Sequence, residues 1–406
     1  MKRIIALTLV LAMLLCGCGS KKDAAVETTA AAATEATTEA TTEPTTEPTT
    51  EPTTEPAPVY FNPLNGEILD EPFTGRIFAN TISNIPDAIP HVGVNQADIL
   101  MEMFVNGSII RCLALYTDIE SADAIGSTRS TRLMFNDIVQ HYSAILTHAG
   151  GSSQVLSNAR ERGIINYNID SLMRQGDELA QGVAYRDKQY KYGEHNLFGI
   201  GSGIKAYVEA QGVEMSLEKD YGLIFTEDGT PAGGEDADKI SIKITHGKAV
   251  KETIMEYDQS LGKYVYYQYG KMMVDQITEV PEAFENVVVM YADISTNGIY
   301  HVADFVAGGT GYFACGGKII PITWTCEDED SAFRFFTADG EPLYFGQGNS
   351  YIAICSPESP VAYERVEPVV VEETAAVEAV AETAEAVAAA AETVATESVS
   401  EEDFGG

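Results

Sequence analysis

The stretch Gly126-Ser-Thr-Arg-Ser-Thr-Arg132 carries the residues best suited to bind a ligand. A helix is predicted over 127–142, and this would place Arg129 and Arg132, three residues apart, on one face of its first turns. Cations are unfavourable there, because a helix N-terminus already carries about half a positive charge. Two arginine forks and the free amides of 127–131 would therefore suit a phosphate or a carboxylate. The alternative is that both arginines pair with the protein's own acids.

Other polar residues could complete this anion site. His148 ends a predicted strand and precedes two glycines, which is where α/β sheets present ligand-binding groups. His195 and Asn196 lie in a polar loop, although a lone histidine is more often a hydrogen-bonded structural residue. The candidate residues are Arg111, Arg129, Arg132, His148, His195, Asn196 and Asp98, with Glu102 as a second acid of the same constellation.

The motifs of common enzyme classes are missing from the sequence. There is no Gly-x-Ser-x-Gly elbow, no His-Glu-x-x-His and no pair of Cys-x-x-Cys, so no catalytic residue is assigned and no metal or cofactor is expected. The Gly-x-Gly-x-Gly run at 199–203 follows no clear predicted strand, which argues against a dinucleotide loop. Cys112 is predicted to be a buried thiol, whereas Cys315 and Cys326 flank a predicted hairpin turn and could form a disulfide.

The predicted elements around the candidate site alternate between strands and helices. Strands are expected over 108–116 and 144–148 on either side of the helix at 127–142, and a further helix begins after Ser202 and ends near Gly212. This order predicts an α/β or α+β N-terminal domain, to which we assign residues 59–238.

The pattern changes after about residue 239. Short alternating strands such as 263–269 and 287–294 predict a smaller β-rich domain over 239–357. The acidic, glycine-containing stretch 227–238 is the predicted boundary between the two domains.

The N-terminus has the features of a bacterial lipoprotein signal peptide over 1–18. Two basic residues precede an apolar run at 4–15, which is too short for a membrane span of about 30 Å. Gly17 suits the cleavage position, so Cys18 is the predicted lipidation site. The alternative is an uncleaved anchor. A lipidated Cys18 would hold the protein on the extracytoplasmic face of the cell membrane.

Two further segments are predicted to be disordered. Residues 19–58 include four copies of Thr-Thr-Glu-Pro, which predict an extended tether. The acidic Ala/Val/Glu-rich tail at 358–406 is predicted to be disordered or transiently helical, and an amphipathic helix or weak coiled coil is the alternative. The net charge of −36 argues against a nucleic-acid partner, which would require clustered Lys and Arg.

Several motifs occur in the order found in one family, and the chain resembles the YerB-like lipoproteins of Gram-positive bacteria. The N-terminal motifs are Asn62-Pro-Leu-Asn-Gly-Glu67, Asn95-Gln-Ala-Asp-Ile99, Arg111 before Leu-Ala-Leu-Tyr116, Gly126–Arg132, His148-Ala-Gly-Gly-Ser152 and His195-Asn-Leu197. The C-terminal ones are Tyr264, Asp304-Phe305, Trp324, Gly340 and Gly346. The resemblance covers nearly all of 60–357 and implies two domains of unknown function.

The chain departs from this family's pattern at the edges of the candidate site. Asn106 and Glu194 stand where the resemblance implies a glycine and a proline, while both arginines of 126–132 are kept. The order of motifs is also distantly similar to that of LytR-CpsA-Psr enzymes, which transfer glycopolymers from a polyprenyl pyrophosphate. That similarity implies a pyrophosphate on Arg111, Arg129 and Arg132, with Asp98 near Mg²⁺.

Three functions follow as expectations. The first is a lipoprotein that binds an anionic cell-wall component or an envelope protein through the arginines. The second is a phosphotransferase or hydrolase acting on lipid-linked or wall-polymer phosphate, with Mg²⁺. The third, a structural spacer, leaves the arginine pair unexplained.

Overall fold

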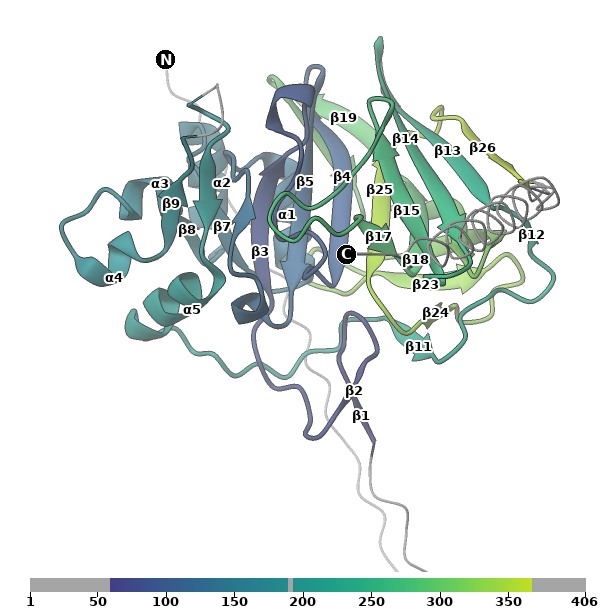
Figure 1. Ribbon diagram of the computed structural model, residues 1–406, viewed down its shortest axis with the longest axis horizontal. Coiled ribbons are helices and arrows are strands. Elements are labelled where there is room, and N and C mark those ends of the chain that lie inside the picture. Colours follow the sequence, from purple (N-terminus) through teal and green to yellow (C-terminus); the bar gives the residue numbers. More distant parts are fainter. Residues whose placement is uncertain (1–58, 189–192, 367–406) are drawn as a thin grey trace, which may run out of the picture. The chain divides into compact units, whose positions relative to one another are not determined.

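The computed structural model describes residues 59–188 and 193–366 (Figure 1). The predicted signal peptide with Cys18, the tether at 19–58 and the tail beyond residue 366 lie outside the described residues. Within the described ranges, no helix is both long enough and apolar enough to cross a membrane.

A large mixed sheet runs through both halves of the chain. Thirteen strands of the described residues belong to it, and β18, β25 and β4 pair in parallel at its centre. In spatial order its main path is β12 (Glu235–Asp236), β22 (Lys318–Thr325), β21 (Gly309–Cys315), β18 (Asn286–Tyr291), β25 (Ser350–Cys355), β4 (Ile99–Asn106), β5 (Ile109–Tyr116), β3 (Phe78–Ser83), β7 (Ile145–His148) and β8 (Asn166–Asn168). Off this path lie β19 (Asp293–Asn297), β20 (Tyr300–Asp304) and β23 (Arg334–Thr337).

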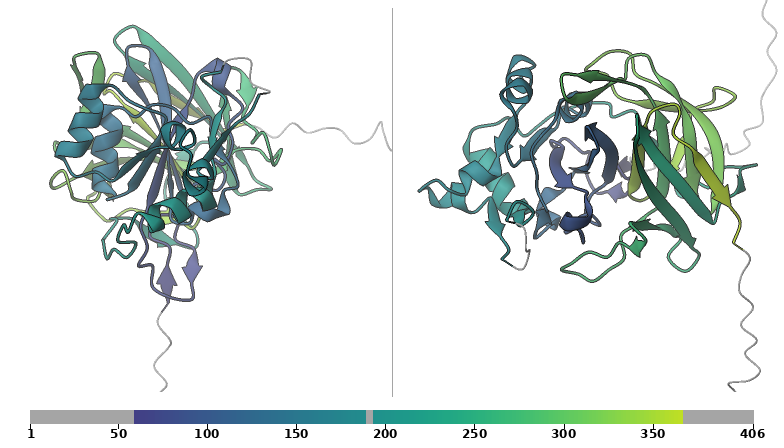
Figure 2. Two further views of the ribbon diagram at one scale, coloured as in Figure 1. Left: turned by 90° about the vertical axis from the view of Figure 1, so that its left-hand side faces the viewer. Right: turned by 90° about the horizontal axis from the view of Figure 1, so that it is seen from above.

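A second, antiparallel sheet packs against one face of the first, and both contribute to one apolar core (Figure 2). Its strands are β16 (Lys271–Met272), β15 (Lys263–Gln268), β14 (Ala249–Asp258), β13 (Lys239–His246) and β26 (Val361–Glu364), with β17 (Ala283–Phe284) beside β15. Three smaller sheets complete the strands of the described residues. One pairs β1 (Tyr60–Phe61) with β2 (Ile68–Leu69), and another pairs β11 (Ile224–Thr226) with β24 (Tyr344–Gly346). In the third, β10 (Leu197–Gly199) lies between β6 (Ile125–Gly126) and β9 (Ala184–Arg186).

The helices of the described residues are short. They are α1 (Leu133–His141), α2 (Ser153–Glu161), α3 (Ile169–Leu172), α4 (Glu178–Gln181) and α5 (Gly201–Ala210), with 3₁₀ turns at Pro86–Ala88 and Ile119–Ser121. Helix α1 buries Met134, Phe135 and Ile138 in a second core on the opposite face of the large sheet. The Ser152 side chain accepts a hydrogen bond from the Val155 amide at 3.3 Å and so begins α2.

The predicted fold class is confirmed, because strands and helices alternate in the N-terminal half and strands dominate the C-terminal half. The strands expected at 108–116 and 144–148 are β5 and β7, and the helix expected after Ser202 is α5. The glycines at its start allow close packing: a Cβ on Gly201 would lie 1.8 Å from the Ile119 carbonyl oxygen, and one on Gly203 would lie 2.0 Å from that of Gly182.

Two expectations were wrong, and one possibility that the sequence left open is not realised. The helix predicted at 127–142 begins only at Leu133, because residues 127–131 pair with neighbouring segments. The tail predicted from 358 begins later, since β26 pairs with β13 in register Ile240↔Tyr363. The four cysteines in the described ranges are all free and buried, so Cys315 and Cys326 do not form a disulfide.

Candidate functional site

The segment from Ser127 to Arg132 lies extended between three neighbours rather than at the start of a helix. The Arg129 amide donates to the Thr81 carbonyl of β3 at 2.9 Å, and the Thr131 amide donates to the Gly150 carbonyl at 2.9 Å. The Thr128 amide donates to the Leu197 carbonyl at 2.8 Å. These three amides are therefore occupied by the protein itself, and for them the prediction that they would bind an anion is wrong.

The same extended segment nevertheless brings three arginines together. Arg111, from β5, and Arg132 both donate to the carbonyl oxygen of Ser130, the latter at 3.2 Å. Arg132 also donates its Nε to the Asn106 side chain at 2.9 Å and lies over the Tyr300 ring, 5.8 Å from its centre. The predicted association of Arg111 with the motif at 126–132 is thus present in the fold.

Positive charge in this arginine cluster (Arg111, Arg129 and Arg132) exceeds negative charge. Among the described residues, Glu194 is the one carboxylate that pairs with any of the three, at 3.0 Å from the Arg129 guanidinium. Arg111 is only 4% exposed, and burial together with its two arginine neighbours lowers its pKa to about 9. The Nε groups of Arg111 and Arg129 are buried with no acceptor in the described part of the chain. A bound anion would both balance the excess positive charge and supply the missing hydrogen-bond acceptors.

His195 borders the cluster, whereas Asn196 faces away from it. The His195 ring contacts the Ser83 hydroxyl at 3.4 Å and the Glu194 carboxylate at 3.5 Å, and burial and Arg129 lower its pKa. The Asn196 side chain accepts a hydrogen bond from Arg186 at 2.5 Å, which orients the loop. His195 is therefore placed to touch a ligand, and Asn196 supports the loop that carries it.

His148 and Asp98 do not join the cluster. His148 is buried at the end of β7, where it hydrogen-bonds Asn166 at 3.1 Å and where burial lowers its pKa. Asp98 comes just before the first residue of β4. Arg111 of β5 pairs with Met103, near the other end of β4. Five residue steps of about 3.3 Å separate the two along the strand pair.

The Asp98 carboxylate is already occupied by the protein. It accepts hydrogen bonds from the Asn65 side chain at 2.6 Å and from the amide and hydroxyl of Thr117 at 2.6 and 2.8 Å. Burial outweighs these bonds and raises its pKa to about 6. It borders a polar depression of about 290 Å³ formed with Asn62 and Lys263, among others. Its role near Mg²⁺ is thus not supported, and in residues 59–188 and 193–366 no group of acids, histidines and cysteines is arranged to hold a metal.

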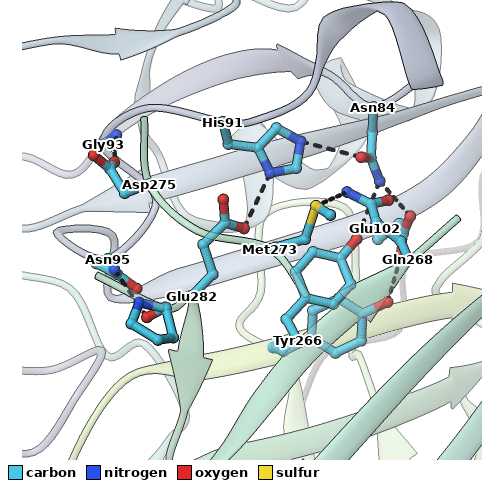
Figure 3. Close-up of polar contacts among 12 residues, drawn as sticks. Asn84, His91, Gly93, Asn95, Glu102, Tyr266, Gln268, Met273, Asp275 and Glu282 are labelled. Carbon is cyan, nitrogen blue, oxygen red and sulfur yellow. Dashed lines mark hydrogen bonds and ion pairs between the residues drawn. The ribbon is translucent and has the colours of Figure 1, made fainter. Parts of the chain in front are cut away.

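Glu102 lies on the opposite face of the large sheet from the arginine cluster. Register pairs Met103 with Arg111 and Glu102 with Cys112, and neighbouring strand residues point to opposite faces. Glu102 belongs to a buried polar cluster with Asn84, His91, Lys251 and Glu282, drawn in part in Figure 3. We did not predict this cluster. Its one signal in the sequence was a glutamate inside an otherwise apolar strand.

Two family models match this chain. One describes the N-terminal domain of a protein of unknown function (DUF3048) and covers 64–214, and the other describes its C-terminal domain and covers 241–352. A protein of Bacillus subtilis (strain 168) named "Putative lipoprotein YerB" is 25% identical over 298 residues, which span 72% of this chain and 85% of that protein. The chain belongs to the two-domain YerB-like family.

A solved structure shares the fold of this YerB-like chain. The crystal structure of the YerB protein from Bacillus subtilis superposes with a TM-score of 0.63 at 22% sequence identity, over 74% of this chain and 99% of that one. The relative's name as a lipoprotein supports a membrane-anchored lipoprotein here. The family has no assigned function, so a function for this chain must be argued from the arginine cluster.

Proposed function

We propose that this YerB-like protein is held by a lipid on Cys18 at the extracytoplasmic face of the cell membrane, where its arginine cluster binds an anionic component of the cell wall. The observation that carries the proposal is the uncompensated charge: Arg111, Arg129 and Arg132 share one carboxylate, that of Glu194. A phosphate offers several acceptor oxygens to such a cluster, and each bond to an arginine would be charge-assisted.

The cluster divides into a fixed part and an accessible part. Arg111 is buried, and its bond to the Ser130 carbonyl fixes its position. The Arg129 side chain is 20% exposed, and its partner Glu194 is 64% exposed. A ligand would enter beside Arg129, displace the weakly held Glu194 and reach the deeper guanidinium. An exposed ion pair contributes at most about 1 kcal/mol, so its displacement costs little.

The test is binding by the mature chain from Cys18 onward, with Cys18→Ser to prevent lipidation. Thermal unfolding is followed with a phosphate-bearing wall-polymer fragment and, separately, with a polyprenyl pyrophosphate analogue, each with and without Mg²⁺. A ligand at 100 times its dissociation constant should stabilise the protein by about 2.7 kcal/mol. Arg129→Ala and Arg132→Ala should abolish the shift.

The matched control is Arg334→Ala, which removes an arginine with a half-exposed side chain that pairs with Asp220. This variant should retain the full shift. No shift with any wall fragment would refute the wall ligand, and competition by an acidic peptide alone would assign the arginines to a protein partner. Turnover of the analogue with Mg²⁺ would instead favour a phosphotransferase or hydrolase.

A further inference from the structure

The buried polar cluster between the two sheets holds an amine, a carboxylate and a carboxamide at one point. Glu102 belongs to β4 and Lys251 to β14, and Asn84 directly follows β3. Glu102 and Asn84 are completely buried, and the Lys251 side chain is 4% exposed. The cluster lies on the opposite face of the large sheet from the arginine cluster and is independent of the proposed anion site.

The carboxylate of Glu102 contacts the side-chain nitrogen of Lys251 and that of Asn84. Its Oε1 lies 2.5 Å from the Lys251 Nζ and also accepts a hydrogen bond from the Asn84 Nδ2. The Tyr266 hydroxyl oxygen lies 3.2 Å from each of the same two nitrogens. The amine and the carboxamide therefore lie side by side on one oxygen of Glu102. The amide nitrogen of Asn84 must face Glu102, because an ionised carboxylate only accepts hydrogen bonds.

The other side of the Asn84 carboxamide faces a hydrogen-bond donor. His91 Nε2 lies 3.1 Å from the Asn84 Oδ1, and His91 Nδ1 lies 3.0 Å from the Glu282 carboxylate (Figure 3). Since an amide oxygen can only accept, His91 donates from Nε2 and Glu282 orients the ring. Negative charge that developed on the Asn84 oxygen would thus meet a positioned donor.

His91, Glu102 and Glu282 are all 0% exposed, and of these groups only Lys251 borders a surface depression, of about 380 Å³. The second oxygen of Glu102, Oε2, accepts hydrogen bonds from the hydroxyls of Thr253, at 2.7 Å, and of Tyr351. A buried ion pair of this kind adds little to stability, because desolvation offsets the attraction. The reactive arrangement has one available substrate, which is the chain itself. Groups held on one carboxylate oxygen in this way have the advantage of an intramolecular reaction.

We propose that Lys251 and Asn84 join in an intramolecular amide bond, with Glu102 as the catalytic acid and base. Glu102 takes a proton from the Lys251 ammonium, and the freed Nζ lone pair attacks Cγ of Asn84. The oxyanion formed on Oδ1 accepts the hydrogen bond from His91. Glu102 then returns its proton to Nδ2, the Cγ–Nδ2 bond breaks and the remaining amine proton leaves by the same carboxylate. One ammonium ion is released, by way of the depression that Lys251 borders, and no oxidant or second reactant is needed.

The bond would connect the two family regions, since Asn84 lies within 64–214 and Lys251 within 241–352. It would also join the two facing sheets, because β3 belongs to the large sheet and β14 to the smaller one. A covalent link between them keeps the core closed even when noncovalent contacts fail, which suits a protein exposed outside the cell.

The test is the intact mass of the mature chain, again from Cys18 onward with Cys18→Ser. We expect a mass lower than the sequence requires by one ammonia, and a branched peptide after proteolysis that joins the segments containing Asn84 and Lys251. A mass equal to that of the sequence overturns the proposal. So does the loss of one water, which would indicate a bond between Lys251 and Glu102, or an ammonia loss that maps to another residue.

Variants separate the roles of the residues. Glu102→Gln keeps the nucleophile and the carboxamide but removes the base, so its mass should equal that of its sequence. Lys251→Met should also show no loss of ammonia. The control Lys243→Met removes an exposed lysine of the adjacent strand β13, and it should retain the lower mass. The wild-type measurement stands by itself if the buried variants fail to fold.

Discussion

Two charged clusters lie on opposite faces of one sheet, and they differ in charge balance and in exposure to solvent. The arginine cluster has three cations for one carboxylate, and one edge of it is exposed at Arg129 and Glu194. The buried polar cluster places Lys251 against Glu102 and is almost closed, since only the 4%-exposed Lys251 side chain borders a surface depression. Adjacent residues of the same two strands supply both clusters: Met103 and Arg111 face one way, and Glu102 and Cys112 the other.

This comparison separates two uses of buried charge. An unbalanced cluster with access to solvent gains free energy when a ligand of opposite charge arrives, and so it favours binding. A balanced cluster without access gains nothing from a ligand and acts within the protein, through structure or through reaction of its own groups. Substitutions on each face should therefore change different measured quantities.

The largest expected effect comes from Glu102→Leu. It removes the base that the proposed amide bond needs and leaves the Lys251 ammonium buried without its partner, so the free energy of unfolding should fall by at least about 3–5 kcal/mol. Urea unfolding measures this change. The double variant Glu102→Leu, Lys251→Met should recover part of the loss, because no charge then remains unpaired.

Glu256 offers a matched control for that prediction. It pairs with Lys239 on the exposed face of the smaller sheet at 2.9 Å, and Glu256→Leu should change the free energy of unfolding by no more than about 1 kcal/mol. If both single variants lost the same stability, the contrast between the buried polar cluster and the surface pairs would not hold.

A third acid, Asp98, tests what happens to a buried carboxylate that has hydrogen bonds but no cation. Burial raises its folded pKa to about 6, above its unfolded value. The folded state therefore binds the proton more tightly, and the stability gained by protonation is full at about pH 4 and is lost as the pH rises through 6. The change is on the order of 2–3 kcal/mol.

Urea unfolding of the wild type and of Asp98→Asn between pH 4 and 7 measures this contribution. The asparagine does not titrate, so the difference in stability between the two proteins should depend on pH over this interval. A constant difference would mean that the hydrogen bonds from Asn65 and Thr117 hold the carboxylate charged throughout.

The local sequence was sufficient to predict β5, β7 and α5, because each combines an apolar run with a clear boundary. It was not sufficient at Ser127–Arg132, which has good capping residues but pairs with β3 and with the loop after β7. The partners in that pairing lie 19 or more positions away in the chain, and Thr81 lies 48 away. Local propensity gave way to tertiary pairing there.

Only part of the candidate site could be predicted, because its assembly also depends on tertiary pairing. Arg111, Arg129 and Arg132 could be selected by residue type, and the fold brings them together. Asp98 and Glu102 were grouped with them, but strand direction and side-chain alternation put them elsewhere. Lys251 and Asn84 could not be grouped from the sequence, because nothing local indicates that both contact Glu102.

Arg111→Met should give the opposite result to Glu102→Leu. It removes a buried cation whose pKa is lowered by burial and by two neighbouring arginines, so the free energy of unfolding should change by less than about 1.5 kcal/mol. Binding of the phosphate-bearing ligand should nevertheless weaken at least about tenfold, because a charge-assisted contact is lost. Isothermal titration measures the affinity. A stability loss as large as that of Glu102→Leu would show that Arg111 is structural.

The smallest expected effect comes from Glu194→Gln. Glu194 competes with a ligand for the Arg129 guanidinium, and its side chain is 64% exposed. Since such a pair contributes about 0.2–1 kcal/mol, its loss should increase ligand affinity about two- to fivefold and leave the unfolding temperature almost unchanged. The increase should shrink at high salt, where exposed charges are screened. If affinity fell instead, Glu194 would hold Arg129 in its binding position, and the arginine cluster would need its one acid to work.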